Sequence, residues 1–173
     1  MSGFPHFRFS GTPAQRGAAY GETLRERIRT TYTLYADKLF AQSALGIAEI
    51  ESRATHVRDI VFDFDPTYGV ELDAVAAGSA LPRWQIYALN ARTEILNTPV
   101  AECTALYFAD AAILGQNWDW VRALEDLAVL VTWDLPNGHR VLSFTEPGML
   151  AKIGFNDRGL GVCLNIMFAR HAL

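Results

Sequence analysis

The sequence predicts an α+β protein, in which a helical segment is followed by a set of antiparallel strands. Through roughly the first hundred residues, apolar side chains recur at spacings of three, four and seven, the period of an amphipathic helix. After Pro99 the apolar runs become short and rich in β-branched and aromatic residues, with turn residues between them. The 173 residues suffice for one domain with a hydrophobic core. We therefore expect one structural domain, built from a helical segment at residues 1–102 and strands at residues 103–173.

The first expected helix begins in the stretch GTPAQRG. Thr12 is followed by Pro13 and, three residues after Thr12, by Gln15. This pattern is a capping box with proline at the first helical position. The apolar stripe that follows is Leu24, Ile28, Tyr35 and Leu39.

Three more helices are expected before Pro99. Residues 46–66 have the helical period and end at Pro66, because proline cannot continue a helix. Residues 68–82 form a short helix whose small side chains permit close packing, and Pro82 opens the last helix. The stripe of the first of these helices is Ile47, Ile50, Val57, Val61 and Phe64, and that of the last is Trp84, Ala88, Ala91 and Ile95.

Five strands are expected after the helices. They fall at residues 103–108, 112–117, 127–135, 139–145 and 161–167, with turns at residues 109–112, 136–138 and 156–159. The Asn137-Gly138 pair is a strong hairpin signal. Both alternating faces of residues 127–135 are mostly apolar, which is typical of a sheet covered on both sides. Because five strands with no later helix would not close such a sheet, we expect the chain to be the front part of a longer protein.

The composition argues against several classes of binding partner. The formal net charge of −4 argues against nucleic acid or an anionic membrane, both of which require a basic face. No apolar run approaches the roughly 18 residues of a membrane span, and the first residues lack the features of a signal peptide. The two cysteines and four scattered histidines show no metal-ligand spacing. We expect a cytoplasmic protein with no metal, no bound cofactor and no nucleic-acid partner.

Cys103 is either a buried core thiol or a nucleophile, and the residues alone leave both interpretations open. A catalytic thiol needs a base or a lowered pKa, and no histidine lies in a recognisable motif with it. If the peptide bond before Cys103 were cut, the freed α-amino group, with a reference pKa near 8, could act as that base. A nucleophile at the junction between the two segments makes sense if the junction is a cleavage site.

A polar cluster follows Cys103 along the chain. If residues 103–108 and 112–117 pair as a hairpin, Gln116, Asn117, Trp118 and Asp119 return beside Cys103. An aspartate there could orient an ammonium group, amide side chains could donate to an oxyanion, and the indole could wall an acyl pocket. Equally, the same residues could form an ordinary loop with packed aromatic side chains.

Several motifs together resemble the acyl-coenzyme A:6-aminopenicillanic acid acyltransferase family, also called the C45 peptidase family, within the N-terminal-nucleophile hydrolases. They are GTPAQRGAAYG near the start, ELDAVAAGSALPRWQIYALNARTEI before the cysteine, ECTALYF and GQNWDW around the expected hairpin, and TEPGMLAKIGFNDRGLGVCLN after it. Their order and their distances along the chain match the family pattern. The resemblance implies an αββα sandwich, of which this chain would hold the N-terminal portion.

The resemblance also implies self-cleavage between Glu102 and Cys103. Cys103 would then be the nucleophile and its α-amine the base, with Asp119 positioning that amine. Gln116 would support the substrate, with Asn117 and Trp118 as further candidates for substrate or oxyanion contacts. Glu102 departs from the glycine that often precedes the cysteine, and family chains are roughly twice as long as this one, with further site residues in the part absent here.

Two functions from different classes are compatible with these residues. The first is a self-processing acyltransferase or amidase that passes an acyl group through a Cys103 thioester to an amine or to water. Its donor would be an acyl-coenzyme A or an acyl amide, so coenzyme A would be a substrate rather than a cofactor. The alternative is an unprocessed, non-catalytic binding protein of the same fold, in which Cys103 stays in peptide linkage.

Overall fold

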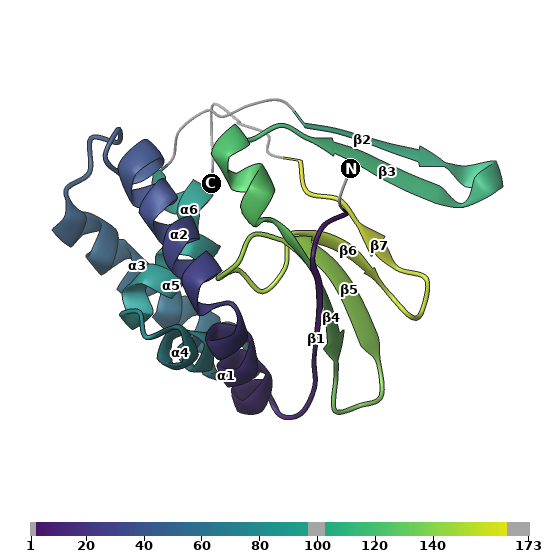
Figure 1. Ribbon diagram of the computed structural model, residues 1–173, viewed down its shortest axis with the longest axis horizontal. Coiled ribbons are helices and arrows are strands. Elements are labelled where there is room, and N and C mark those ends of the chain that lie inside the picture. Colours follow the sequence, from purple (N-terminus) through teal and green to yellow (C-terminus); the bar gives the residue numbers. More distant parts are fainter. Residues whose placement is uncertain (1–2, 97–102, 166–173) are drawn as a thin grey trace.

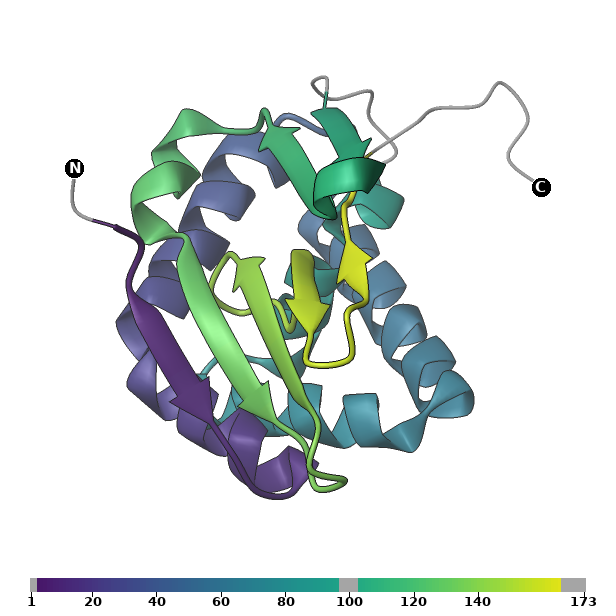
Figure 2. The ribbon, with the colours of Figure 1, turned by 90° about the vertical axis from the view of Figure 1, so that its right-hand side faces the viewer.

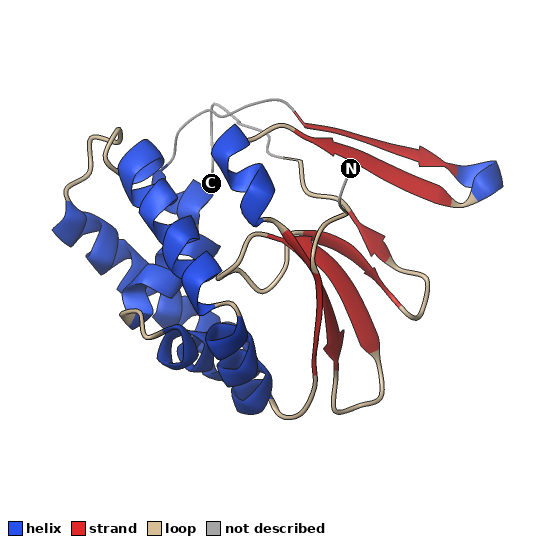
Figure 3. Cartoon of the chain, viewed as in Figure 1, coloured by secondary structure: helices blue, strands red, loops and turns tan. Residues whose placement is uncertain are grey.

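The computed structural model describes residues 3–96 and 103–165 and shows a mixed α+β architecture. A layer of helices lies against one face of a five-stranded sheet, and a separate two-stranded hairpin lies beyond the other face (Figure 1). The rotated view shows the sheet strands crossing in front of the helices (Figure 2). The division into a helical and a strand segment agrees with the predicted fold class (Figure 3).

Helices precede the strands along the chain as expected, except that one strand comes before the first helix. The helices are α1 (Pro13–Thr23), α2 (Arg25–Tyr35), α3 (Ile47–Phe64), α4 (Pro66–Ser79), α5 (Arg83–Asn90) and α6 (Arg92–Leu96), with a π-helical turn η1 (Ala36–Phe40) after α2. The strands are β1 (His6–Phe9), β2 (Cys103–Phe108), β3 (Ile113–Trp118), β4 (Val129–Asp134), β5 (Arg140–Thr145), β6 (Ile153–Asn156) and β7 (Gly161–Val162), with 3-10 turns η2 (Ala109–Ala111) and η3 (Arg122–Leu127).

The larger sheet contains two strands that sequence reasoning missed, β1 and β6. Its order is β1-β4-β5-β6-β7, and β1 runs parallel to β4 while the other neighbours are antiparallel. The expectation that the first segment is only helical is therefore wrong at β1. Four residues are too few for a periodic signal, and this strand is defined by its pairing with a distant part of the chain. The expected strand at residues 161–167 is confirmed only for β7, and its last two residues lie outside the described residues.

The first helix begins as its capping box predicts. The Gln15 backbone N donates to Thr12 Oγ1 at 3.3 Å, and the Thr12 backbone N donates to Gln15 Oε1 at 2.9 Å. The helical run then breaks at Leu24, so α1 and α2 are two helices where the stripe predicted one. The predicted stripe is nevertheless in the core, with Leu24, Ile28 and Tyr35 buried.

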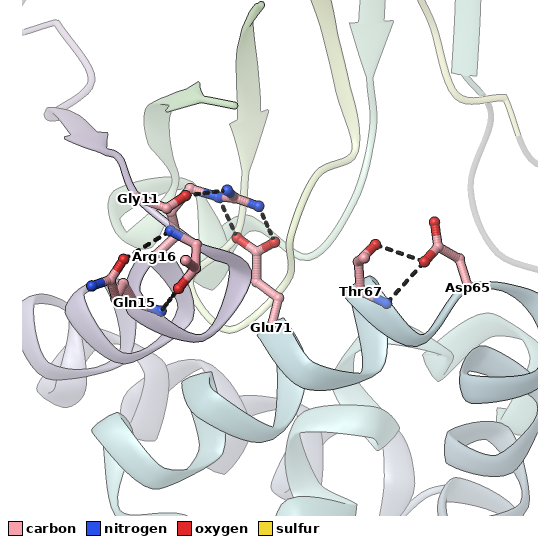
Figure 4. A network of polar contacts seen from close by, with 7 residues as sticks. Gly11, Gln15, Arg16, Asp65, Thr67 and Glu71 are labelled. Carbon is pink, nitrogen blue, oxygen red and sulfur yellow. Dashed lines mark hydrogen bonds and ion pairs between the residues drawn. The ribbon is translucent and has the colours of Figure 1, made fainter. Parts of the chain in front are cut away.

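The two ends of α3 differ from what its apolar stripe predicts. Pro66 does stop this helix, and it also begins α4, whose N-terminus is capped by Asp65 Oδ1 accepting from Thr67 N at 2.8 Å (Figure 4). Ile50 is buried as predicted, but Ile47 and Phe64 are 61% and 80% exposed. Both residues lie at the ends of this helix, which is at the outer edge of the helical layer in Figure 1.

The helices α1 and α4 pack with their backbones in near contact, as the small residues of α4 predict. A Cβ added to Gly21 would collide with the Val75 carbonyl oxygen, and one added to Gly78 would collide with the Ala18 carbonyl oxygen. The same interface contains a buried ion pair, in which Arg16 Nη2 lies 2.7 Å from Glu71 Oε2 (Figure 4).

The two faces of the sheet differ in how they are covered. Val129, Val131 and Trp133 of β4 are buried in the hydrophobic core with the helices. On the other face, Leu142 and Phe144 line a cleft of about 840 Å³ between the sheet and the hairpin. Both faces are apolar, as the sequence predicts, but this cleft is open in the part of the chain that the structure describes.

Candidate active site

Cys103 lies at the first residue of β2, where the hairpin returns beside it. The antiparallel register pairs Cys103 with Trp118, Thr104 with Asn117 and Ala105 with Gln116. The predicted hairpin is therefore confirmed.

The predicted site residues lie on different faces of this hairpin. Cys103, Gln116 and Trp118 are half-buried, whereas Thr104 and Asn117 are exposed. Because side chains alternate between the faces of a strand, paired residues share a face and their neighbours point away from it. Trp118 thus lies on the side of the Cys103 thiol, which is free of any disulfide, and Asn117 lies on the opposite side.

Gln116 makes contacts of its own with the segment after β7. Its Nε2 donates to the Leu164 carbonyl oxygen at 2.5 Å, and its Oε1 accepts from the Leu164 backbone N at 3.0 Å. The next residue, Asn165, donates from Nδ2 to the Cys103 carbonyl oxygen at 3.3 Å. Gln116 therefore holds in place a segment that contacts Cys103. Sequence reasoning missed Asn165, although it lies in one of the motifs that carried the resemblance.

Asp119 lies one residue beyond β3, next to the partner of Cys103. Its side chain is exposed and lines a cleft of about 570 Å³ together with Trp118, Trp120 and Phe144. Within the described ranges, no side chain forms an ion pair with Asp119, so its carboxylate is available to an ammonium group. Glu102, the residue before the expected cut, lies outside the described residues.

Three charged side chains are buried near Trp118 and Trp120, and we call them the charge cluster: Arg92, Glu146 and Lys152. Lys152 Nζ lies 2.6 Å from Glu146 Oε2, and the two side chains are 3% and 0% exposed. Lys152 Nζ also lies 3.8 Å from the centroid of the Trp118 ring. Arg92 Cζ lies 5.5 Å from the Trp120 ring centroid.

Hydrogen bonds tie the charge cluster to the helices. Tyr35 OH donates to Glu146 Oε2 at 2.8 Å and accepts from Trp120 Nε1 at 2.7 Å. Lys152 Nζ and Glu146 Oε1 have no aligned hydrogen-bond partner among the described residues. The cluster thus keeps unused donor and acceptor capacity although it is buried.

Two side chains of the helical layer hold the loop that carries Glu146 and Lys152. Asn90 of α5 donates to the Gly148 carbonyl oxygen at 2.8 Å and accepts from the Leu150 backbone N at 3.2 Å. Tyr20 of α1 accepts from the Gly148 backbone N at 2.9 Å. Gly148 has a φ of 97°, which favours glycine. Asn90, which lies in one of the motifs that carried the resemblance, therefore has a structural role, since it fixes the loop at residues 146–152.

Burial is the main influence on the ionisation of Lys152. Desolvation lowers the pKa of its amino group, the Glu146 charge raises it, and the Arg92 charge lowers it; with a small raising effect from a charge on Cys103, the resulting pKa is about 7. Burial and the Glu146 charge also raise the pKa of Tyr35, so its hydroxyl stays protonated.

Sequence reasoning missed Glu146 and Lys152. The usable signal is that these two residues are the charges of an otherwise apolar, glycine-containing stretch, TEPGMLAKIGF. Such charges need a partner if the stretch is buried, but spacing along the chain does not connect them with Cys103.

No group of three His, Cys, Asp or Glu side chains within the described ranges could hold a metal ion. None of the helices described is both long and apolar enough to cross a membrane.

No family model matches the chain. Among curated proteins it is similar to the 40 kDa form of acyl-coenzyme A:6-aminopenicillanic-acid-acyltransferase from Emericella nidulans, with 26% identity over 167 residues. That relative is an acyltransferase. The alignment covers 94% of this chain but 47% of the relative, so the chain spans about half of that protein's length. This similarity supports the resemblance to the acyltransferase family that the sequence motifs indicated.

Proposed function

We propose that this chain is part of an acyltransferase or amidase that works through a thioester on Cys103. The single observation that carries the proposal is the position of this thiol. It is free and half-buried, and it begins the strand whose partner leads directly into Asp119. The similarity to an acyltransferase over almost the whole chain supports the same reaction class.

The proposed mechanism begins with cleavage of the bond between Glu102 and Cys103. The new α-amino group of Cys103 then takes the thiol proton, so the nucleophile and its base belong to one residue. The thiolate adds to the acyl carbon of an acyl-coenzyme A or an acyl amide, and the resulting thioester passes the acyl group to an amine or to water. Asp119 binds the α-ammonium group.

The shape of the site suits an acyl chain. Trp118, Trp120 and Phe144 are apolar walls of the cleft that Asp119 also lines. The helical layer, the sheet with two apolar faces and the hairpin beyond it support the proposal that the fold is the N-terminal portion of an αββα sandwich. In this proposal the remaining part of the fold comes from a C-terminal half.

Intact mass tests the cleavage. The purified chain and the full-length product of its gene are each weighed beside their Cys103→Ala variants. We expect two pieces that sum to the whole, with the second beginning at Cys103, only when the cysteine is present. A second sample, treated with a thiol-reactive acyl analogue, should gain mass on the piece that begins with Cys103.

The opposite results have distinct meanings. A single uncut mass for the full-length product would remove the α-amine base and favour the unprocessed binding protein. That alternative is suggested by Glu102, which stands where family members often have glycine. Acyl labelling that persists at the same level in Cys103→Ala would exclude the thioester. Cleavage of the full-length product but not of the short chain would show that the C-terminal half is needed to build the site.

A further inference from the structure

We propose that Lys152 is the proton and charge partner of the Cys103 thiol. Its neutral amine accepts the thiol proton, and the ammonium that results stabilises the thiolate. The inference rests on the proposed role of Cys103 as a nucleophile. It adds a group that is present in the uncut chain, where the nitrogen of Cys103 is part of a peptide bond and cannot serve as the base.

The strand register places the two groups on one side of the hairpin. Cys103 and Trp118 are directly paired, and the side chains of such a pair have Cβ atoms about 5 Å apart on the same face. Lys152 Nζ lies over the ring of that same tryptophan, 3.8 Å from its centroid. The amine therefore approaches the hairpin from the face on which the Cys103 side chain lies.

When Lys152 is protonated, the charges in this region balance only if Cys103 is ionised. Glu146 is paired with Lys152, and no ion pair joins Arg92 to a carboxylate among the described residues, so the charge cluster carries one net positive charge when Lys152 is protonated. Tyr35 adds no charge, since its hydroxyl stays protonated. An uncompensated buried charge is costly, so either Lys152 is neutral or a second anion is present. The thiolate of Cys103 is that second anion, and proton transfer from sulfur to nitrogen keeps the group neutral overall.

The titration of Lys152 agrees with this geometry. With its pKa lowered to about 7 by burial, the amine can accept and return a proton near neutral pH. A negative charge on Cys103 favours the ammonium form of Lys152.

The chemical step balances without any further reactant. The proton on Cys103 Sγ moves to Lys152 Nζ, and the thiolate forms a C–S bond with an amide carbonyl carbon. When the C–N bond breaks, the leaving nitrogen takes the proton back from Lys152. The products are a thioester on Cys103, a free amine and a neutral Lys152. Water or an amine then releases the acyl group.

Thiol alkylation across pH tests the pairing directly. The rate of iodoacetamide addition to Cys103 is measured from about pH 5 to about pH 9, in a Cys163→Ser background that removes the other free thiol. For Lys152→Met we expect alkylation about tenfold slower at neutral pH and a rate profile moved to higher pH, since the favourable charge is lost. Lys152→Arg should keep fast alkylation, because arginine stays charged.

Lysine spectroscopy gives a second readout that does not depend on a variant at Lys152. The chain has two lysines, Lys38 and Lys152, so isotopic labelling of the lysine side chains produces two NMR signals. The Lys152 signal should titrate near neutral pH, and its midpoint should fall in Cys103→Ala, where the anion is absent. The exposed Lys38 provides the matched control, because Lys38→Met should leave the alkylation profile of Cys103 unchanged.

Two results would overturn the inference. One is an identical alkylation profile for Lys152→Met and the parent, with native near-ultraviolet circular dichroism for both. The other is a Lys152 midpoint that Cys103→Ala does not move. Neither result affects the proposed function if cleavage or an acyl adduct at Cys103 is still seen by intact mass. Conversely, an intact Lys152–Cys103 coupling without cleavage or adduct would refute the proposed function alone.

Discussion

At the scale of single residues, Asp73 on α4 shows how one carboxylate joins three helices. Arg58 of α3 donates to it through Nε at 3.1 Å and Nη2 at 2.8 Å, and Tyr87 of α5 donates to it at 3.1 Å. Partial burial acts to raise the pKa of Asp73, but the hydrogen bonds from Arg58 and Tyr87 outweigh it and hold the pKa below its usual value. The ionised carboxylate is thus the form that the folded protein prefers.

This preference predicts a loss of stability in acid. Because the pKa of Asp73 is lower in the folded than in the unfolded state, its stabilisation is complete above pH about 4 and disappears as the pH falls through the folded value. We expect Asp73→Asn to lower the urea midpoint at pH about 6, and the difference from the parent to shrink toward pH about 2. The exposed Asp63→Asn serves as the control. A difference that stays constant across this pH range would contradict the assignment.

At the scale of elements, α1 and α4 depend on glycine at their contact. Gly21 faces backbone atoms of α4, namely the Val75 carbonyl oxygen and the Ser79 nitrogen, so an added methyl group meets atoms that cannot rotate away. Within an isolated helix, alanine would stabilise by about 1 kcal/mol relative to glycine. Overpacking of a tight contact costs about 1–3 kcal/mol, and here it should outweigh that gain.

Substitution at this contact should therefore destabilise the protein. We expect Gly21→Ala to lower the free energy of unfolding by about 1–2 kcal/mol, measured by urea denaturation. Gly115→Ala is the matched control, because a Cβ at that position of β3 meets nothing within 4 Å. A stabilised Gly21→Ala variant would show that helix propensity, and not the close approach, governs this position.

At the scale of the whole molecule, the segments before and after residue 103 share one core. Phe9 of β1 contacts Trp133 of β4, with ring centroids 5.7 Å apart, and Tyr20 contacts the same indole at 5.3 Å. The strand β1 also pairs with β4 along its full length. A cut before Cys103 would therefore leave two pieces held together by a sheet and a shared hydrophobic core.

Association of the two segments can be measured directly. Residues 1–102 and 103–173, expressed as separate chains in one cell, should co-purify through a tag on either one and separate only in denaturant. Phe9→Asp should weaken this association, because it places a charge in the shared core. Recovery of the tagged segment alone, while both are expressed, would contradict the prediction.

Local rules explain why much of the secondary structure could be predicted. The capping box at Thr12, the stop at Pro66 and the Asn137-Gly138 hairpin each depend on residues within a few positions of one another. The β2–β3 hairpin is local in the same sense, and it carried the prediction that Trp118 returns beside Cys103. Local patterns failed where burial depends on distant neighbours, as at the exposed ends of α3.

The sequence by itself thus determined the α+β order, the periods of helix and strand, and the neighbours of Cys103 along its own hairpin. Only the tertiary structure decided that β1 joins the sheet, and that Arg92, Glu146 and Lys152 gather near Trp118 and Trp120. The physical reason is the range of the interactions. Caps and turns are set by adjacent residues, whereas a parallel strand pair or a buried charge cluster exists only once packing has brought remote segments together.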